Sequence, residues 1–402
     1  MSDSPHSVPN PTAVSLGMQR QFEIYQMGLA GKKLSVPIPL AQLEKKAAEI
    51  LPPQAYDYIA GGASGERTMH ANLAAFEGWQ IVPRMLRDVS QRDLSIELLG
   101  HTLPAPVLLG PIGAQGIIHP ESDLASGRAA ASLGIPFILS TLSSRTMEDV
   151  AQVMGNAPRW FQLYWGKDHE LTSSLLRRAK RSGYSALVVT LDTNLLGWRE
   201  RDLQHTYLPF LLGQGLANYF SDPVFRSRLK ETPEADPAAA IRLWASLFSN
   251  TALTWSDLAW LRQQSRMPIL LKGILHPDDA RQAIDAGCDG IIVSNHGGRQ
   301  VDGAVAALDA LPAVASVIQQ RIPVLFDSGI RYGSDAVKAL ALGARAVLLG
   351  RLYLWGLAVA GEQGVRDIVQ NFVAEFDLTL GLSGFKSCKE LDASPLRHRE
   401  IG

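Results

Sequence analysis

Residues 290–300 read Gly-Ile-Ile-Val-Ser-Asn-His-Gly-Gly-Arg-Gln, a short apolar run followed at once by a polar turn. The run has the length and the β-branched residues that are typical of a buried strand. The turn places an imidazole, His296, and a guanidinium, Arg299, directly after this strand. Two glycines between them allow the backbone to approach a ligand closely, which predicts an active site. A helix-capping loop with a solvated His and Arg is the simpler alternative.

Similar apolar runs recur from about residue 105 onward, separated by longer amphipathic stretches. This alternation is the pattern of βα units around a parallel sheet. The predicted strands are 107–109, 137–139, 160–163, 186–189, 269–271, 290–293, 324–326 and 346–349. Eight strands close a TIM barrel, whereas an open doubly wound sheet more often has about five or six. The predicted fold class is therefore α/β, a TIM (β/α)8 barrel.

The stretches between the predicted strands have helix signals. Residues 278–284 and 334–340 begin with acidic or Ser residues of the N-cap type, and they end at Gly287 and Gly343. We therefore expect helices there, as in an ordinary barrel.

Residues 1–104 precede the predicted barrel, 105–402, as an N-terminal helical segment. It contains a predicted helix near 40–51 and an alternating stretch near 94–103, which we expect to form the barrel floor.

An insertion follows the fourth predicted strand, at residues 203–253. Because it is far longer than an ordinary βα loop of about 2 to 6 residues, we expect a lid. Within it, residues 208–220 are apolar and aromatic, which favours a mobile lid or a packed loop; a membrane-contact segment is the alternative.

The composition limits the possible partners. The 402 residues are 46% hydrophobic, and 38 Lys and Arg balance 39 Asp and Glu, so no net field draws the chain to nucleic acid or to an acidic membrane. Only Cys288 and Cys388 are present, so neither a disulfide framework nor a metal site is predicted. Residues 1–14 lack signal-peptide features, and no apolar run reaches about 18 residues. We therefore expect a cytoplasmic protein with no membrane segment.

Polar residues end three of the predicted strands in pairs spaced two residues apart, so both members of a pair lie on one face of the strand. The pairs are Gln162 with Tyr164, Thr190 with Asp192, and Ser294 with His296. Lys272 ends the fifth strand, where a buried lysine must reach water or meet a negative group such as a reduced flavin. Taken singly, Gln162 and Thr190 are equally compatible with satisfied core polar groups.

Strands seven and eight are followed by a different pattern, in which glycine lies close to arginine. The segments are Asp327-Ser328-Gly329-Ile330-Arg331 and Gly350-Arg351. Loops after these two strands commonly hold phosphate in TIM barrels, through free backbone N–H groups and an arginine. The pattern predicts a cofactor with a phosphate tail; two surface arginines near turns are the alternative.

The sequence resembles the FMN-dependent L-2-hydroxy acid oxidising family, which includes glycolate oxidase, lactate oxidase, lactate 2-monooxygenase and mandelate dehydrogenase. The resemblance extends from about Leu51 to Leu391 and is carried by residues 56–63, 161–164, 294–300 and 327–331. It implies an FMN cofactor, a small 2-hydroxy acid substrate and a homo-oligomer, since family members are usually tetramers or octamers.

The resemblance also implies roles for individual residues. His296 would be the catalytic base, with Asp192, Lys272 and Tyr164 as further catalytic residues. The substrate would be bound by Tyr58, Tyr164, Arg199, Arg299 and His296. FMN would be bound by Pro111, Ile112, Gly113, Ser140, Gln162, Thr190, Lys272, Ser294, Asp327, Gly329, Arg331, Gly350 and Arg351.

Within the family, residues 190–202 and 218–225 resemble lactate 2-monooxygenase, whereas residues 114–121 resemble the simple oxidases. Leu142, where glycolate oxidase-like relatives carry a larger aromatic residue, and Leu196 suggest an apolar pocket for a short side chain. L-Lactate is the first choice, and glycolate and 2-hydroxybutyrate stay open.

Dioxygen is the expected electron acceptor, giving either acetate, CO2 and water or pyruvate and hydrogen peroxide. The alternatives are a dehydrogenase that uses a quinone or cytochrome, and a noncatalytic FMN-binding barrel.

Overall fold

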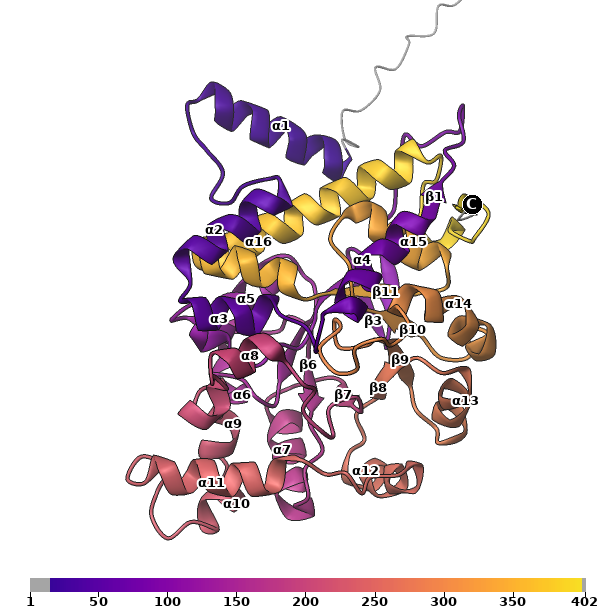
Figure 1. Cartoon of the computed structure of the whole chain (residues 1–402). Helices are drawn as coiled ribbons and strands as arrows, with labels where there is room; N and C mark the ends of the chain where they lie inside the picture. The colour runs from indigo at the N-terminus through magenta and orange to yellow at the C-terminus, as the bar shows by residue number, and fades with distance from the viewer. Residues whose placement is uncertain (1–14, 400–402) are drawn as a thin grey trace, which may run out of the picture.

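The centre of the molecule is a closed barrel of parallel strands, ordered β10-β11-β4-β5-β6-β7-β8-β9 (Figure 1). The computed structural model describes residues 15–399. The strands are β4 Val107–Leu109, β5 Phe137–Ser140, β6 Arg159–Leu163, β7 Leu187–Thr190, β8 Ile269–Ile274, β9 Gly290–Val293, β10 Val324–Phe326 and β11 Ala346–Leu349. Each coincides with one of the predicted runs, so the predicted TIM barrel is confirmed.

Helices surround this barrel. They are α5 Ser122–Ser132, α6 Met147–Met154, α7 His169–Arg181, α12 Leu258–Gln264, α13 Pro277–Asp285, α14 Ala307–Ile318, α15 Gly333–Ala341 and α16 Arg351–Leu382. The predicted helices 278–284 and 334–340 lie within α13 and α15, and Gly287 and Gly343 follow their ends with φ of +69° and +112°.

The predicted N-caps of α13 and α15 are wrong. The N-cap residues are His276, whose side chain accepts a hydrogen bond from the Asp278 N–H, and Tyr332. The acidic residues lie instead in the first turn of each helix, where their charge interacts favourably with the helix dipole.

A two-stranded antiparallel hairpin, β2 Ile96–Leu98 and β3 His101–Leu103, closes the bottom of the barrel. Ile96, Leu98 and Leu103 are buried in the barrel interior, and this hairpin lies in the stretch 94–103 that we expect to form the barrel floor. They pack there with strand residues that include Leu108, Ile138, Trp160, Val188, Leu270, Ile292, Leu325 and Leu348. Because side chains alternate along a strand, these residues define which positions of each strand face inward.

The N-terminal helices are α1 Leu16–Leu29, α2 Leu40–Ile50, α3 Pro53–Ala60 and α4 Arg67–Gly78, of which α2 is the helix predicted near 40–51. Helix α1 lies along α16 (Figure 1), where the Gly17 N–H donates to Asp377 Oδ2 at 2.9 Å. Strand β1, Trp79–Ile81, pairs antiparallel with β12, Leu396–His398. The predicted lack of a signal peptide concerns residues 1–14, which lie outside the described residues.

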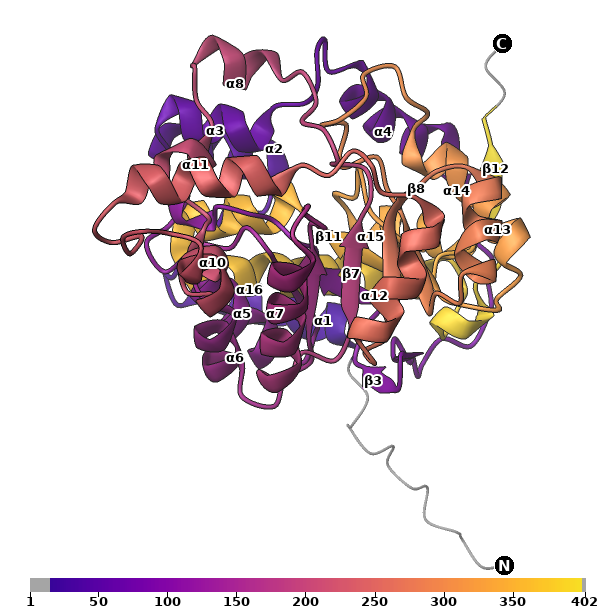
Figure 2. The same ribbon diagram turned by 90° about the horizontal axis from the view of Figure 1, so that it is seen from below.

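The insertion between β7 and β8 folds into short helices that gather on one side of the molecule (Figures 1 and 2). They are α8 Glu200–Gln204, η2 Pro209–Leu212, α9 Ala217–Phe220, α10 Pro223–Ser227, α11 Pro237–Phe248 and η3 Trp255–Asp257. Within residues 208–220, Phe210 and Tyr219 are 7% and 3% exposed, whereas Leu211 and Leu212 are 54% and 64% exposed, so the segment is packed only in part. Helix α8 lies beside α3, joined to it by Arg201, whose Nη1 lies 3.2 Å from Asp57 Oδ1.

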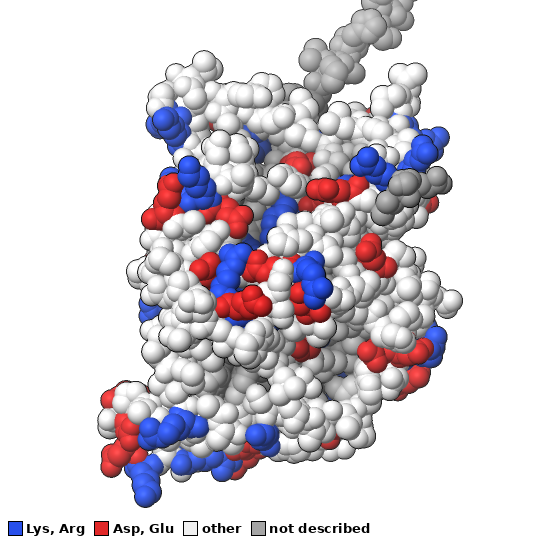
Figure 3. Space-filling model, in the orientation of Figure 1, with Lys and Arg blue, Asp and Glu red and all other residues white. Residues whose placement is uncertain are grey.

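Charged residues of both signs are mixed on the face seen in Figure 3, as the balanced composition leads one to expect. Within residues 15–399, no helix is long and apolar enough to cross a membrane. In the same part of the chain, no group of three or more His, Cys, Asp or Glu is arranged to hold a metal ion.

Candidate active site

A polar layer lies directly above the apolar barrel interior, at the carboxyl ends of the strands. Side chains alternate along a strand, so the position two residues after each inward-facing apolar residue also faces the inside of the barrel. These positions are Gly110, Ser140, Gln162, Thr190, Lys272, Ser294, Asp327 and Gly350. The period-two pattern therefore brings residues from every strand of the barrel into one ring.

Hydrogen bonds join neighbouring members of this ring. Gln162 Nε2 donates to Thr190 Oγ1 at 2.9 Å, and its Oε1 lies 3.1 Å from Ser140 Oγ. Lys272 Nζ donates to Ser294 Oγ at 2.8 Å and lies 3.1 Å from Asp327 Oδ2. Since Gln162 and Thr190 satisfy each other, the interpretation of these two as ordinary core polar groups stays compatible with the structure.

A cavity of about 320 Å³ opens above the ring. Most of the predicted site residues line it: Tyr58, Pro111, Ile112, Gly113, Tyr164, Arg199, Lys272, His296, Arg299, Asp327, Gly329, Arg331, Gly350 and Arg351. The predicted residues that do not line it are Ser140, Gln162, Thr190, Asp192 and Ser294. Ser294 and Asp192 contact lining residues, Lys272 and His296 respectively. The structure thus brings together residues that lie far apart in the sequence.

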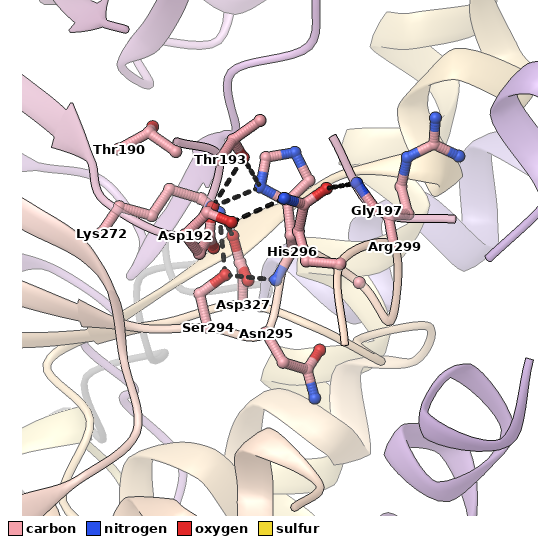
Figure 4. A network of polar contacts seen from close by, with 12 residues as sticks. Thr190, Asp192, Thr193, Gly197, Lys272, Ser294, Asn295, His296, Arg299 and Asp327 are labelled. Atoms are coloured by element: carbon pink, nitrogen blue, oxygen red, sulfur yellow. Dashed lines mark hydrogen bonds and ion pairs between the residues drawn. The ribbon is translucent and has the colours of Figure 1, made fainter. Parts of the chain in front are cut away.

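His296 is held by a carboxylate behind it (Figure 4). Its Nδ1 lies 2.7 Å from Asp192 Oδ1, and the Thr193 hydroxyl lies 2.9 Å from the same oxygen and 3.2 Å from Nδ1. Burial opposes ionisation of Asp192, but His296 and Lys272 outweigh it and lower the pKa of Asp192 to about 2. An ionised carboxylate only accepts hydrogen bonds, so Nδ1 carries the proton and Nε2 is left unprotonated.

The charge state of His296 favours proton acceptance. Burial lowers the pKa of His296 below the usual value for histidine, although Asp192 acts in the opposite direction. At neutral pH the imidazole is therefore neutral, as a general base requires. Its side chain is 19% exposed, which excludes the alternative of a solvated His in a capping loop.

The backbone of the His296 turn is left-handed over three consecutive residues, with φ of +58° at His296, +67° at Gly297 and +75° at Gly298. A Cβ at Gly298 would lie 2.5 Å from the Met69 nitrogen of α4, and one at Gly297 would lie 2.8 Å from Arg351 Nη1. The two glycines therefore make room for other parts of the protein. Gly297 lines the cavity, so the expectation that the backbone approaches a ligand at this turn stays a prediction.

Arg199 and Arg299 lie side by side at the cavity. Arg199 Nε donates to the Arg299 carbonyl at 3.1 Å, and Arg299 Nη1 donates to the Gly61 carbonyl at 2.7 Å. The nearest carboxylate to Arg199 is that of Asp202, at 3.9 Å. Burial and the neighbouring Arg199 lower the pKa of Arg299 to about 10. Two crowded guanidinium groups facing one cavity form a binding site for an anion such as a carboxylate.

Arg331 and Arg351, which are predicted to bind the phosphate of a cofactor, also line the cavity. Arg351 donates to the carbonyls of Ile59, Gly61 and Gly297 at 2.7 to 3.0 Å, and Arg331 Nη1 donates to the Ile330 carbonyl at 3.0 Å. Burial lowers the pKa of both arginines. Among the described residues neither arginine forms an ion pair, and these hydrogen bonds go to neutral carbonyls, so both guanidinium groups can bind an anion in the cavity.

The space beside these arginines is open, since a Cβ at Gly350 would meet no atom closer than 4.0 Å. An anionic group therefore fits there, and the donor set matches a phosphate. Both arginines are partly buried, so the interpretation as surface arginines is wrong.

Lys272 meets a negative group of the protein itself. It is 4% exposed, and although burial disfavours its charge, Asp327 and Asp192 raise its pKa above the ordinary value. Lys272 is thus a buried permanent cation at the cavity wall.

Aromatic residues of the insertion form a wall that the sequence interpretation missed. Ring centroids lie 6.2 Å apart for Tyr58 and Phe210, 5.6 Å for Phe210 and Trp244, 5.0 Å for Trp244 and Phe248, and 5.2 Å for Phe248 and Tyr164. The insertion therefore connects the two tyrosines predicted to bind substrate. The only local signal is the i, i+4 spacing of Trp244 and Phe248 on α11, which is equally typical of a core helix.

The geometry agrees with comparisons to known proteins. A family model described as FMN-dependent dehydrogenase matches residues 47–398. The FMN-dependent alpha-hydroxy acid dehydrogenase qulF of Penicillium citrinum is 44% identical over 381 residues, covering 94% of this chain and 95% of that protein. The L-lactate oxidase of Lysinibacillus sphaericus is 45% identical, covering 88% and 91%. A crystal structure of mandelate oxidase superposes with a TM-score of 0.80 at 38% identity, covering 90% and 99%.

Proposed function

This chain belongs to the FMN-dependent dehydrogenase family and is an FMN-dependent 2-hydroxy acid oxidoreductase; from this premise we propose that it oxidises a short L-2-hydroxy acid, with L-lactate the first choice, using dioxygen as electron acceptor. The observation that carries the proposal is the convergence of three groups on one cavity. They are the unprotonated Nε2 of His296 and the two guanidinium groups of Arg199 and Arg299.

These groups match the two functional groups of a 2-hydroxy acid. Arg199 and Arg299 bind the carboxylate, which fixes the position of C2 and its hydroxyl. His296 accepts the hydroxyl proton at Nε2, and Asp192 stabilises the imidazolium that results. Tyr58 and Tyr164 line the same cavity and donate hydrogen bonds to the substrate. Burial raises the pKa of Tyr164, so its hydroxyl keeps its proton.

FMN, when bound, accepts the two electrons that leave the substrate. Arg331 and Arg351, with the backbone at Gly329 and Gly350, would hold its phosphate, and Lys272 would supply a fixed positive charge that stabilises the reduced flavin. Pro111, Ile112 and Gly113 form another part of the cavity wall. Ser140, Gln162, Thr190 and Ser294, also predicted to bind FMN, lie in the polar ring, where Ser294 accepts a hydrogen bond from Lys272 and the other three are joined to one another.

The substrate side chain is proposed to be short and apolar. Leu142 and Leu196 both line the cavity, and Leu142 is 3% exposed. A pocket of this kind discriminates single methylene groups by only about 1 to 3 kcal/mol, so activity on glycolate and 2-hydroxybutyrate is expected beside L-lactate.

A colour change tests the proposal. The purified yellow protein is mixed with L-lactate without air, and the visible absorbance of its flavin is followed. We expect the absorbance to fall and to return when air is admitted. Bleaching that returns only with a quinone or cytochrome indicates the dehydrogenase alternative, and no bleaching with any L-2-hydroxy acid indicates a noncatalytic barrel.

Product analysis then separates the two outcomes with dioxygen. If the insertion retains pyruvate and hydrogen peroxide together, they react to acetate, CO2 and water, which is lactate 2-monooxygenase chemistry. If it releases them, the products are free pyruvate and hydrogen peroxide, as for a lactate oxidase. The homo-oligomer and the cytoplasmic location stay predictions.

A further inference from the structure

Gln300, the last residue of the turn that carries His296 and Arg299, crosses to the loop between β7 and α8. This loop, residues 191–199, carries Asp192 at one end and Arg199 at the other. Gln300 itself does not line the cavity. Any influence that it has on a bound substrate must therefore act through other residues.

The carboxamide of Gln300 has a partner for every hydrogen-bonding position. Its Nε2 donates to the Asp192 carbonyl at 2.6 Å and to the Leu195 carbonyl at 2.8 Å. Its Oε1 accepts from Arg199 Nη2 at 3.0 Å and from the Gly197 N–H at 3.4 Å. A carboxamide has two N–H groups and two lone pairs, so this set uses its full capacity.

Apart from the side-chain contacts of Asp192 and Thr193 with His296 and of Arg199 with the Arg299 carbonyl, the loop has few other attachments. Within the described part of the chain, the backbone of residues 192–197 makes no hydrogen bond to another backbone group. Leu195 and Leu196 are 63% and 53% exposed, so they do not anchor the loop in the core. Backbone bonds resume only at its ends, where the Leu191 N–H donates to the Lys272 carbonyl and the Ser64 N–H donates to the Trp198 carbonyl.

The contact between the two loops is also close. A Cβ at Gly197 would lie 2.5 Å from the Arg299 carbonyl oxygen and 2.7 Å from that of Gln300. A small shift of the loop would therefore move Arg199 relative to Arg299 and Asp192 relative to His296. Since a misplacement of about 1 Å can cost about 10²-fold in rate, the attachment of this loop affects the chemistry.

We propose that Gln300 is a positioning residue, which fixes Asp192 behind His296 and Arg199 beside Arg299 through a single carboxamide. The proposal rests on the proposed oxidation of a 2-hydroxy acid. One residue thereby couples the proton-accepting group to the carboxylate-binding group.

Two variants separate the positioning of Asp192 from the positioning of Arg199. Gln300→Met has a side chain of similar length and keeps none of the hydrogen bonds. Gln300→Glu keeps oxygen atoms that accept from Arg199 and Gly197 but lacks both donors to Asp192 and Leu195. Gln282→Met, at an exposed position of α13, is the matched control.

The measurement is anaerobic rapid mixing of each FMN-loaded protein with L-lactate, which gives a limiting flavin reduction rate and an apparent substrate Kd. For Gln300→Met we expect the rate to fall about 10²-fold and the Kd to rise about tenfold. For Gln300→Glu we expect the same fall in rate with a smaller rise in Kd, because the Arg199 contact is kept. Gln282→Met should match the parent protein in both quantities.

A pH profile distinguishes positioning from a general structural role. In Gln300→Met, which adds no charge, the acidic limb of the reduction rate should move to lower pH, because a displaced Asp192 stabilises the imidazolium less, while Lys272 and Arg199 still disfavour it. Variants that lose thermal stability or FMN content but keep the parent's rate, Kd and acidic limb per bound flavin would overturn the proposal. If the parent protein itself is not reduced by any L-2-hydroxy acid, the proposed function fails instead.

Discussion

Asp192 Oδ1 lies 2.7 Å from His296 Nδ1, and the two residues follow different strands, β7 and β9. The strand β8 between them supplies Lys272, whose charge helps to keep Asp192 ionised. Three adjacent strands thus determine the tautomer of one imidazole. Because Nδ1 carries the proton in this arrangement, Nε2 is free, and the site can accept a proton there.

Asp192→Asn should slow flavin reduction by about 10²-fold while FMN binding is retained, because the imidazolium loses its stabilising carboxylate. Removing that charge lowers the pKa of His296 further, so the acidic limb of kcat/KM should move to lower pH. The profile of kcat/KM against pH for both proteins measures this. An unshifted acidic limb would show that Asp192 does not act on the base.

Lys272→Met leaves the half-buried Asp327 carboxylate without its cation. We expect the free energy of unfolding to fall by up to about 3 kcal/mol, and the Kd for FMN to rise. Adding Asp327→Asn should recover about 1 kcal/mol of the loss, because the uncompensated charge is then gone. Urea denaturation with FMN in excess gives the free energy of unfolding of the parent protein, the two single variants and the double variant, which together form a double-mutant cycle. If the losses of the two single variants add up to the loss of the double variant, Lys272 and Asp327 do not interact directly, which would contradict the pair.

Gly298→Ala should destabilise the protein far more than Gly303→Ala, although both glycines have positive φ, +75° and +83°. A Cβ at Gly298 would meet the α4 backbone at 2.5 Å, whereas one at Gly303 would meet nothing within 4 Å. We expect a loss of about 1 kcal/mol at Gly303 from backbone strain alone and at least about 3 kcal/mol at Gly298. Melting temperatures of the two variants provide the comparison, and equal losses would refute the close contact.

Asp123 gives the stability a pH dependence that is separate from catalysis. Its Oδ2 accepts from the Ser144 N–H at 2.9 Å, but its buried Oδ1 has no hydrogen-bond partner among the described residues. Burial raises its pKa to about 7, so the folded state holds a proton that the unfolded state has already released. Stability should therefore fall as pH rises from the ordinary Asp range to about 7, by about 1.4 kcal/mol per pH unit from this group.

Asp123→Asn should remove that part of the slope. Chemical denaturation at pH 5, 6 and 7 compares the variant with the parent protein. The same slope in both would mean that Asp123 ionises normally in the folded state.

The barrel and much of the polar ring could be predicted from sequence for a physical reason. Strand periodicity is local, and parallel strands bring their carboxyl ends to one edge, so Gln162, Thr190 and Ser294 could be placed together without knowing any other contact. The same reasoning located Lys272, but it did not predict the pairing of Lys272 with Asp327, because pairing between strands depends on the closed order of the barrel.

Features that depend on packing between distant segments could not be predicted. The local sequence around Gly298 suggested that a ligand lies beside this glycine. In the structure its neighbour is the backbone of Met69 in α4, which is far away in the sequence. Trp244 and Phe248 have the spacing of core residues, and only the fold of the insertion brings them to Tyr164. Arg199 was assigned by resemblance alone, since nothing local distinguishes it from the neighbouring Arg201, which forms ion pairs with Asp57 and Glu66 instead.

The most direct test of the central claim is the rate at which L-lactate reduces the bound flavin without air in the parent protein and in His296→Asn. Asn keeps a polar atom near the position of Nδ1 but has no basic nitrogen at the position of Nε2 to accept the hydroxyl proton. We predict that the variant binds FMN normally and that its reduction is slowed about 10²- to 10⁴-fold. Reduction of His296→Asn at the parental rate would contradict the assignment of His296 as the base.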